Sequence, residues 1–259
     1  MSGIPYRTAL IVGAGAGISA SFARALATAG LRVGVAARSR DKLAALAAET
    51  GVQTFVVDAS VPADVARLFA EADERLGEPD VVLYNAAARA PGPIAEVDPE
   101  SVRKAIEITA FGGFLTVREA ARRMAPRGSG AILLTGASAS LKGYPQSAAF
   151  AMGKFALRGL AQSVARELGP NGIHVAHFVI DGGVRGARRP DPPERPDSTL
   201  DPDAIAQTYL DILRQPRSAW SLEVELRPWV ETEGTLVATA SQILNASGTD
   251  SRTSPSRIA

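Results

Sequence analysis

The chain has 259 residues, of which 46% are apolar and 5% aromatic, and its formal net charge is +1. This length suits one large α/β domain, and the near-neutral charge gives no general attraction to nucleic acid or to an anionic membrane. Because there is no cysteine and there are only 2 histidines, disulfides and cysteine-bound metals are excluded, and no metal site is expected.

The first predicted strand and helix enclose a glycine-rich turn. The apolar run at residues 9–12 predicts a strand buried on both faces, and residues 18–29 carry apolar side chains at helical spacing. Three glycines lie between these segments: Gly13, Gly15 and Gly17. An ordinary turn between a strand and a helix also contains glycine. With these flanking elements, however, the turn predicts a nucleotide site in which backbone N–H groups bind a phosphate.

The second predicted strand, residues 32–36, is followed by Ala37 and Arg38. In a dinucleotide-binding fold, an acidic side chain here binds the ribose of NAD, and an arginine accommodates the extra phosphate of NADP. The sequence therefore favours NADP(H) over NAD(H), unless Arg38 is only a solvated loop charge. A third strand, residues 54–57, ends at Asp58, which either accepts a hydrogen bond from the adenine amine or starts a turn.

Strands and helices continue to alternate along the chain. Further helices are expected at residues 41–49, 62–76, 100–124, 147–168 and 203–214, and strands at 81–84, 131–135, 175–180 and 221–226. The alternation predicts one doubly wound, Rossmann-type α/β domain over residues 1–232, with a parallel sheet of about seven strands and helices on both faces. The long helix is expected to loosen at Gly112 and Gly113. Residues 186–202 predict a mobile loop over the site, and residues 233–259 a disordered or loosely packed tail.

Three motifs in this order resemble those of the short-chain dehydrogenase/reductase family. They are the turn Gly13-Ala-Gly-Ala-Gly-Ile-Ser19, the strand end Tyr84-Asn-Ala-Ala87, and Phe150-Ala-Met-Gly-Lys154 in place of the family's Tyr-x-x-x-Lys. The resemblance covers residues 7–230 and implies a nicotinamide dinucleotide cofactor. The implied cofactor contacts are Gly13, Gly15, Gly17, Ile18, Arg38, Asp58, Asn85, Ala86, Lys154, Asp181, Gly182 and Val184.

The resemblance also implies a catalytic set from which this chain departs. In the family, a tyrosine exchanges a proton with the substrate, and a lysine lowers the tyrosine's pKa and binds the ribose. A serine orients the substrate oxygen, and an asparagine holds a relay water. Here the four positions are Phe150, Lys154, Ala137 with Ser138 beside it, and Thr109. Because phenylalanine has no proton to exchange, ordinary carbonyl reduction should be ~10²–10⁴-fold slower unless another group replaces the acid.

Ser138 and Tyr144 are candidates for that replacement. A second possibility is His177 with Asp181, since an imidazole titrates near neutral pH. Tyr144 is otherwise expected to pack as a loop aromatic, and His177 as a buried strand residue with a satisfied hydrogen bond. The basic run Arg185-Gly-Ala-Arg-Arg189 is expected to be solvated, with contact to an anionic substrate or a cofactor phosphate as the alternative.

The sequence thus predicts an NADP(H)-linked oxidoreductase with an atypical catalytic set, acting on a small carbonyl or alcohol. Two alternatives stay open: a non-catalytic NADP(H)-binding sensor or regulatory subunit, and reduction of an already protonated imine. No stretch has the pattern of a signal peptide or a membrane span, so a soluble cytoplasmic protein with no nucleic-acid or membrane partner is expected. A homodimer or homotetramer is expected because helices 100–124 and 147–168 are apolar on several faces. The apolar residues on these helices include Phe111, Phe114, Phe155, Leu157 and Leu160.

Overall fold

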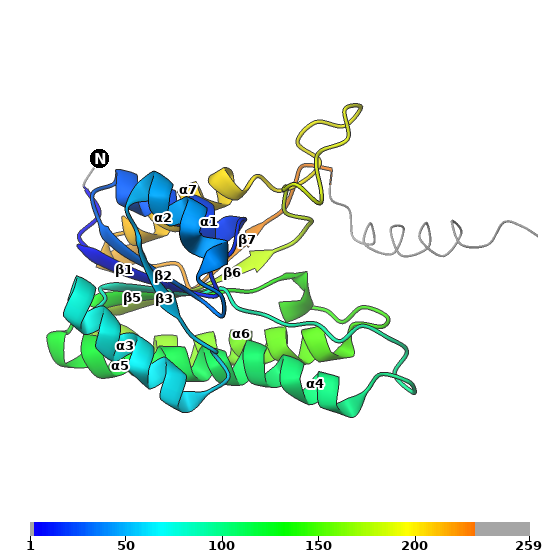
Figure 1. Ribbon diagram of the computed structural model, residues 1–259, viewed down its shortest axis with the longest axis horizontal. Helices are drawn as coiled ribbons and strands as arrows, with labels where there is room; N and C mark the ends of the chain where they lie inside the picture. The colour runs from blue at the N-terminus through cyan, green and yellow to red at the C-terminus, as the bar shows by residue number, and fades with distance from the viewer. Residues whose placement is uncertain (1–2, 231–259) are drawn as a thin grey trace, which may run out of the picture.

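A parallel sheet forms the middle layer of the protein in a computed structural model, which describes residues 3–230 (Figure 1). The seven strands lie in the order β3-β2-β1-β4-β5-β6-β7. Their bounds are Thr8–Val12 (β1), Arg32–Ala37 (β2), Gln53–Val56 (β3), Val81–Tyr84 (β4), Gly130–Thr135 (β5), Ile173–Ile180 (β6) and Glu223–Leu226 (β7). This topology confirms the predicted doubly wound α/β fold. The predicted tail, residues 233–259, lies outside the described residues.

Helices cover both faces of the sheet (Figure 1). On one face lie α1 (Ile18–Thr28), α2 (Ala44–Thr50) and α7 (Pro202–Leu213), and on the other α3 (Pro62–Leu76), α4 (Pro99–Ile106), α5 (Gly112–Arg127) and α6 (Ala148–Leu168). Since successive strand residues point to opposite faces, Ile11 joins one apolar core and Leu10 and Val12 join the other. None of the helices described is long and apolar enough to cross a membrane.

The predicted long helix 100–124 is divided by a π-helical turn, Glu107–Phe111. The prediction that it loosens at Gly112 and Gly113 is wrong, because both glycines are helical and buried. A Cβ at Gly112 would lie 2.4 Å from the hydroxyl of Tyr84, and one at Gly113 would lie 2.4 Å from a methyl carbon of Leu157. The glycines therefore allow α5 to pack closely on β4 and α6.

The apolar residues of α5, α6 and the π-helical turn do not all share one role. Leu157 is fully buried in the core, and Leu160 packs against the same core. By contrast, Phe111, Phe114 and Phe155 are 42%, 46% and 45% exposed. Of these five residues, only the three phenylalanines therefore leave apolar surface on the outside of this helix layer.

The carboxyl ends of β1, β4, β5 and β6 meet at one edge of the sheet. The chain order reverses between β1 and β4, where β1 pairs with β2 on one side and β4 on the other. In open parallel sheets, ligands bind beside the carboxyl ends of the strands at such a reversal. The loops after these strands therefore define the place to look for a site.

Candidate functional site

The three glycines after β1 differ in their surroundings. Gly13 has a φ of +88°, and a Cβ on it would lie 2.2 Å from the backbone nitrogen of Ala86. This glycine is therefore required by the close approach of the chain after β4. A Cβ at Gly15 or Gly17 would meet no atom within 4 Å. These two positions line open space, as expected where a ligand approaches the backbone.

Helix α1 begins at this turn without a side-chain cap. Gly17 is its N-cap, no side chain accepts from its first N–H groups, and no acidic residue lies in its first turn. The positive end of the helix is thus left for an anion. The side-chain amide of Asn85 donates to the hydroxyl of Ser19 at 2.7 Å, and that hydroxyl donates to the carbonyl of Gly13 at 3.3 Å. Ser19, which the sequence did not single out, therefore ties the end of β4 to the turn.

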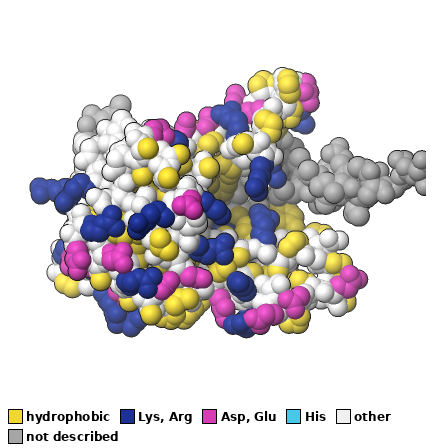
Figure 2. All heavy atoms as spheres, viewed as in Figure 1, with side chains coloured by type: hydrophobic (Ala, Val, Ile, Leu, Met, Phe, Trp, Pro, Cys, Tyr) yellow, Lys and Arg dark blue, Asp and Glu magenta, His cyan; other side chains and the backbone are white. Residues whose placement is uncertain are grey.

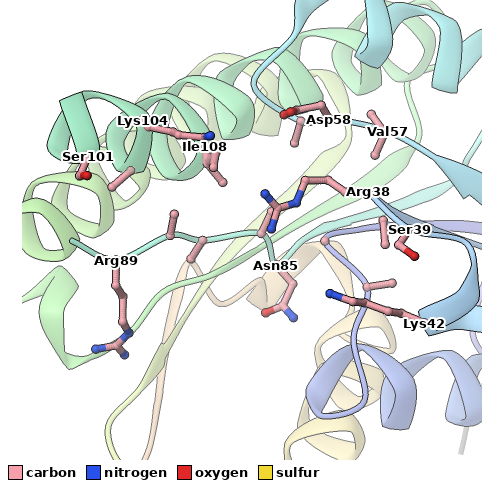
Figure 3. A pocket seen from close by; sticks show the side chains of 18 residues that line it. Arg38, Ser39, Lys42, Val57, Asp58, Asn85, Arg89, Ser101, Lys104 and Ile108 are labelled. Carbon is pink, nitrogen blue, oxygen red and sulfur yellow. The ribbon is translucent and has the colours of Figure 1, made fainter. Parts of the chain in front are cut away.

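The first cavity, of about 440 Å³, lies beside the carboxyl ends of β2 and β3. Arg38, Lys42 and Lys104 line it, and Figure 3 shows their charged groups reaching toward its middle from different elements. Asp58 also lines this cavity and accepts hydrogen bonds from the backbone and hydroxyl of Ser60. These bonds, with the charge of Arg38, hold the pKa of Asp58 below its usual value. Asp58 therefore both starts a turn and faces the cavity.

The second cavity, of about 870 Å³, lies beside the carboxyl ends of β5 and β6. It brings together ten of the residues singled out from the sequence: Ile18, Asn85, Ala137, Ser138, Tyr144, Phe150, Lys154, Gly182, Val184 and Arg189. Asn85 and Arg89 line both cavities, so the two join at the end of β4. Lys and Arg side chains flank the hollow on the face shown in Figure 2.

Lys154 is buried at the wall of the second cavity. Its ammonium donates to the carbonyl of Thr135, at the end of β5, at 2.6 Å. Burial, and secondarily the charge of Arg89, lower the pKa of Lys154 to about 7. This lysine therefore exchanges its proton near neutral pH, where an ordinary lysine remains charged.

Phe150 lies one helical turn before Lys154, with its ring 5.7 Å from the lysine ammonium. The guanidinium of Arg89 lies over the same ring, 3.8 Å from its centroid. Arg89 was missed at the sequence level. The one feature of the sequence that pointed to Arg89 is its place directly after the Asn85-Ala-Ala-Ala motif. Its contact with Phe150 could not be predicted, because the two residues are far apart in the chain.

Ser138 and Tyr144 reach the second cavity from the segment between β5 and α6. Ser138 is buried in a short 3₁₀ turn, and the ammonium of Lys142 lies 5.8 Å from the centre of the Tyr144 ring. Gln146 lines the cavity next to them with a φ of +57°. A non-glycine residue in this conformation is uncommon and is often found near functional sites.

Three residues that the sequence offered for catalysis or cofactor binding, Thr109, His177 and Asp181, line neither cavity. The hydroxyl of Thr109 accepts from the backbone of Ala88 at 3.0 Å. His177 is buried, with Nδ1 at 3.0 Å from Glu223, and burial lowers its pKa. Asp181 is buried and pairs with Arg227 at 3.2 Å. Neither His177 nor Asp181 is among the residues that line the second cavity, and each has a partner on or just after β7.

The two kinds of glycine predict different effects of the same substitution. Gly13→Ala should lower the free energy of unfolding by at least ~2 kcal/mol, because it combines an unfavourable φ with a backbone clash. Gly15→Ala should leave the free energy of unfolding within about 0.5 kcal/mol, but weaken cofactor binding. Denaturant unfolding and calorimetric titration of both variants check this. Equal stability losses would contradict the assignment.

No cluster of three or more His, Asp or Glu side chains within residues 3–230 could hold a metal ion. Cationic, hydroxyl and amide groups line the two cavities.

Comparisons with known proteins agree with this geometry. The sequence model described as short chain dehydrogenase matches residues 7–187. A trans-4-hydroxycyclohexanecarboxylate dehydrogenase of Sinomonas cyclohexanicum is 33% identical over 197 residues, covering 70% of this chain and 74% of that protein. A short-chain dehydrogenase structure from Rhodopseudomonas palustris is 38% identical, with a TM-score of 0.74 over 86% of this chain and 99% of that one.

A second solved structure, the alcohol dehydrogenase of the archaeon Thermococcus sibiricus, holds 5-hydroxy-NADP. It is 27% identical, with a TM-score of 0.76 over 87% of this chain and 98% of that one. The sheet order, the glycine turn and the matched region all agree, and the chain belongs to the short-chain dehydrogenase family.

Proposed function

We propose that this protein is an NADP(H)-linked oxidoreductase that interconverts a small carbonyl compound and its alcohol. The observation that carries the proposal is the junction of the two cavities. A basic cavity at the end of β2 meets, through Asn85 and Arg89, a cavity lined by Lys154 and by hydroxyl-bearing residues that include Ser138 and Tyr144. The relatives named above include an alcohol dehydrogenase and a hydroxycyclohexanecarboxylate dehydrogenase, which supports this class of reaction.

The residues fit a dinucleotide. The open space at Gly15 and Gly17 and the uncapped start of α1 suit its pyrophosphate. Arg38 and Lys42 would hold the ribose phosphate, and Lys154 the other ribose. When bound, the reduced nicotinamide supplies a hydride to the carbonyl carbon.

The carbonyl oxygen must then gain a proton, and Phe150 has none to give. Ser138 and Tyr144 line the cavity beside Phe150 and are our candidates to bind this oxygen. Lys154 lies at the same wall and can restore the proton of a neighbouring hydroxyl, since its pKa is near 7. A protonated imine would need less help from these groups and remains the alternative substrate.

The direct test is a panel of aldehydes, ketones and cyclic imines with NADPH, followed by the loss of nicotinamide absorbance at controlled pH. Consumption of NADPH with at least one substrate class is expected. Binding without any turnover would instead support a sensor or regulatory subunit, which the oxidoreductase relatives do not favour.

Arg38 should decide the choice of cofactor. We expect Arg38→Ala to remove most of the preference for NADP(H), because the variant loses the charge that would bind the extra phosphate of NADP. Ala37 provides no carboxylate for the ribose hydroxyls of NAD, so the variant should not bind NAD(H) more tightly than the wild type does. Calorimetric titration with both cofactors measures this, with Arg40→Ala as the control, since Arg40 is exposed and does not line the first cavity. Equal affinities of the wild type for NADP(H) and NAD(H) would refute the preference.

We also propose that copies of this chain associate as a homodimer or homotetramer through the exposed phenylalanines of α5, α6 and the π-helical turn. Phe111 and Phe114 stack at 6.1 Å on the surface, close to half exposed. Exposed aromatic groups of this kind are unfavourable in water and typical of protein interfaces. A monomer in light scattering at micromolar concentration would contradict the proposal.

A further inference from the structure

Two arginines face the second cavity without a carboxylate partner in the described chain. Arg89 and Arg189 line this cavity, and no ion pair within residues 3–230 involves either of them. Arg185, in the same basic run as Arg189, pairs with Asp191 at 2.9 Å and also contacts Asp201. Within the basic run, Arg185 is therefore paired with aspartates, whereas Arg189 lines the second cavity.

The position of Arg89 leaves its hydrogen-bonding edge available. The Cζ atom of its guanidinium lies over the Phe150 ring, 3.8 Å from the centroid. Stacking of this kind fixes the plane while the N–H groups at its edge stay free to bind a carboxylate or phosphate. Figure 3 shows this guanidinium turned away from Arg38, so the two arginines serve different parts of the site.

The side chain of Arg189 lies against Gly183. A Cβ at Gly183 would lie 2.1 Å from Nη1 and 3.0 Å from Cζ of Arg189. The guanidinium therefore rests against the backbone after β6, and a Cβ at Gly183 would displace it. Arg189 is exposed to solvent, as predicted, but its side chain also lines the second cavity.

The second cavity is lined by basic side chains and by no acidic ones. Arg89, Arg189 and Lys154 line it, and no Asp or Glu is among its lining residues. Burial, and secondarily the charge of Arg189, lowers the pKa of Arg89. Burial, and secondarily the charge of Arg89, lowers the pKa of Lys154. Two like-charged arginines beside a lysine that is partly protonated near neutral pH favour the entry of an anion.

We propose that Arg89 and Arg189 bind an oxoanion group, a carboxylate or a phosphate, on the carbonyl or alcohol substrate of this protein. The proposal rests on the proposed function, since it names the class of substrate for the same site. Ser138 and Tyr144 line the same cavity as the two arginines, so the anion and the reacting oxygen can belong to one small molecule. A cofactor phosphate is the weaker explanation, because Arg38 and Lys42 line the other cavity.

The test is calorimetric titration of the full chain, with NADP⁺ bound, using malonate and inorganic phosphate as probes at constant ionic strength. Binding of at least one probe is expected, and the tighter one identifies the anion. Arg89→Gln and Arg189→Gln should each weaken it about tenfold or more, as for loss of a charge-assisted hydrogen bond. The matched control is Arg188→Gln, which removes the same charge from an exposed neighbour that does not line the cavity.

Each outcome decides the proposal. Failure of both probes to bind, or equal weakening by Arg188→Gln, would overturn it. Weakened NADP⁺ binding by the Arg89 and Arg189 variants, with the probes unaffected, would assign the arginines to the cofactor and also overturn it. Arg89→Lys keeps the charge but not the planar fork, so it should bind the anion less well than the wild type and better than Arg89→Gln.

The test is separate from that of the proposed function, because it measures binding and not turnover. Anion binding without NADPH consumption by any substrate would support the arginine site and contradict the oxidoreductase. Turnover of neutral carbonyls without binding of either probe would do the reverse.

Discussion

Replacing Lys154 by methionine is expected to stabilise the protein without cofactor at pH 7 and to give little advantage at pH 10. The wild type must bury a lysine whose pKa falls from 10.5 to about 7 on folding. Below pH 7 both the folded and unfolded states hold this proton, and folding buries a charge. Between pH 7 and 10.5 the unfolded state binds more protons, so the stability of the wild type rises with pH.

The free-energy difference between wild type and Lys154→Met should therefore change by roughly 3–5 kcal/mol between pH 7 and pH 10. Denaturant unfolding across this range measures it. Burial raises the pKa values of Tyr84 and Tyr209, but both tyrosines are present in each protein and cancel in the difference. The control is Lys104→Met at an exposed position, which should follow the wild-type slope. Parallel curves for wild type and Lys154→Met would show that Lys154 is not desolvated.

The fold could be predicted because its determinants are local. Each strand is a short apolar run, each helix has its own period, and alternation of the two allows only a parallel sheet. The one clear error, at Gly112 and Gly113, has a physical reason. Glycine is read from sequence as a helix breaker, whereas here it is required by the side chains of Tyr84 and Leu157 on other elements.

Only those residues of the candidate site that belong to a sequence motif could be predicted. Phe150 and Lys154 share a helix face because they are four residues apart, so the sequence already placed them together. Arg89 and Arg189 follow different strands, and only the packing of the loops brings them to one cavity. His177 is buried on its strand with a hydrogen-bond partner, as the non-catalytic alternative expected, but its partner Glu223 comes from β7, which the sequence alone did not place beside β6.

Phe150→Tyr should create or raise reductase activity toward simple ketones or aldehydes at least tenfold, since a positioned general acid contributes ~10²–10⁴-fold. Phe150 lines the second cavity, with the ammonium of Lys154 5.7 Å and the guanidinium of Arg89 3.8 Å from its ring centre. Two cations so near would lower the pKa of a new phenol and favour proton exchange with it. The gain will be smaller if the altered positions Ala137 and Thr109 cooperate with this one, because cooperating catalytic groups are not additive.

The measurement is the rate of NADPH consumption at saturating cofactor. Phe155→Tyr is the control, because it adds the same hydroxyl on the same helix at a position that is 45% exposed and outside the cavity. A wild type that already reduces carbonyls efficiently, with nothing added by Phe150→Tyr, would mean that another residue supplies the proton. Ser138→Ala, Tyr144→Phe and His177→Ala would then identify it, with the first two expected to lose activity because their side chains line the cavity.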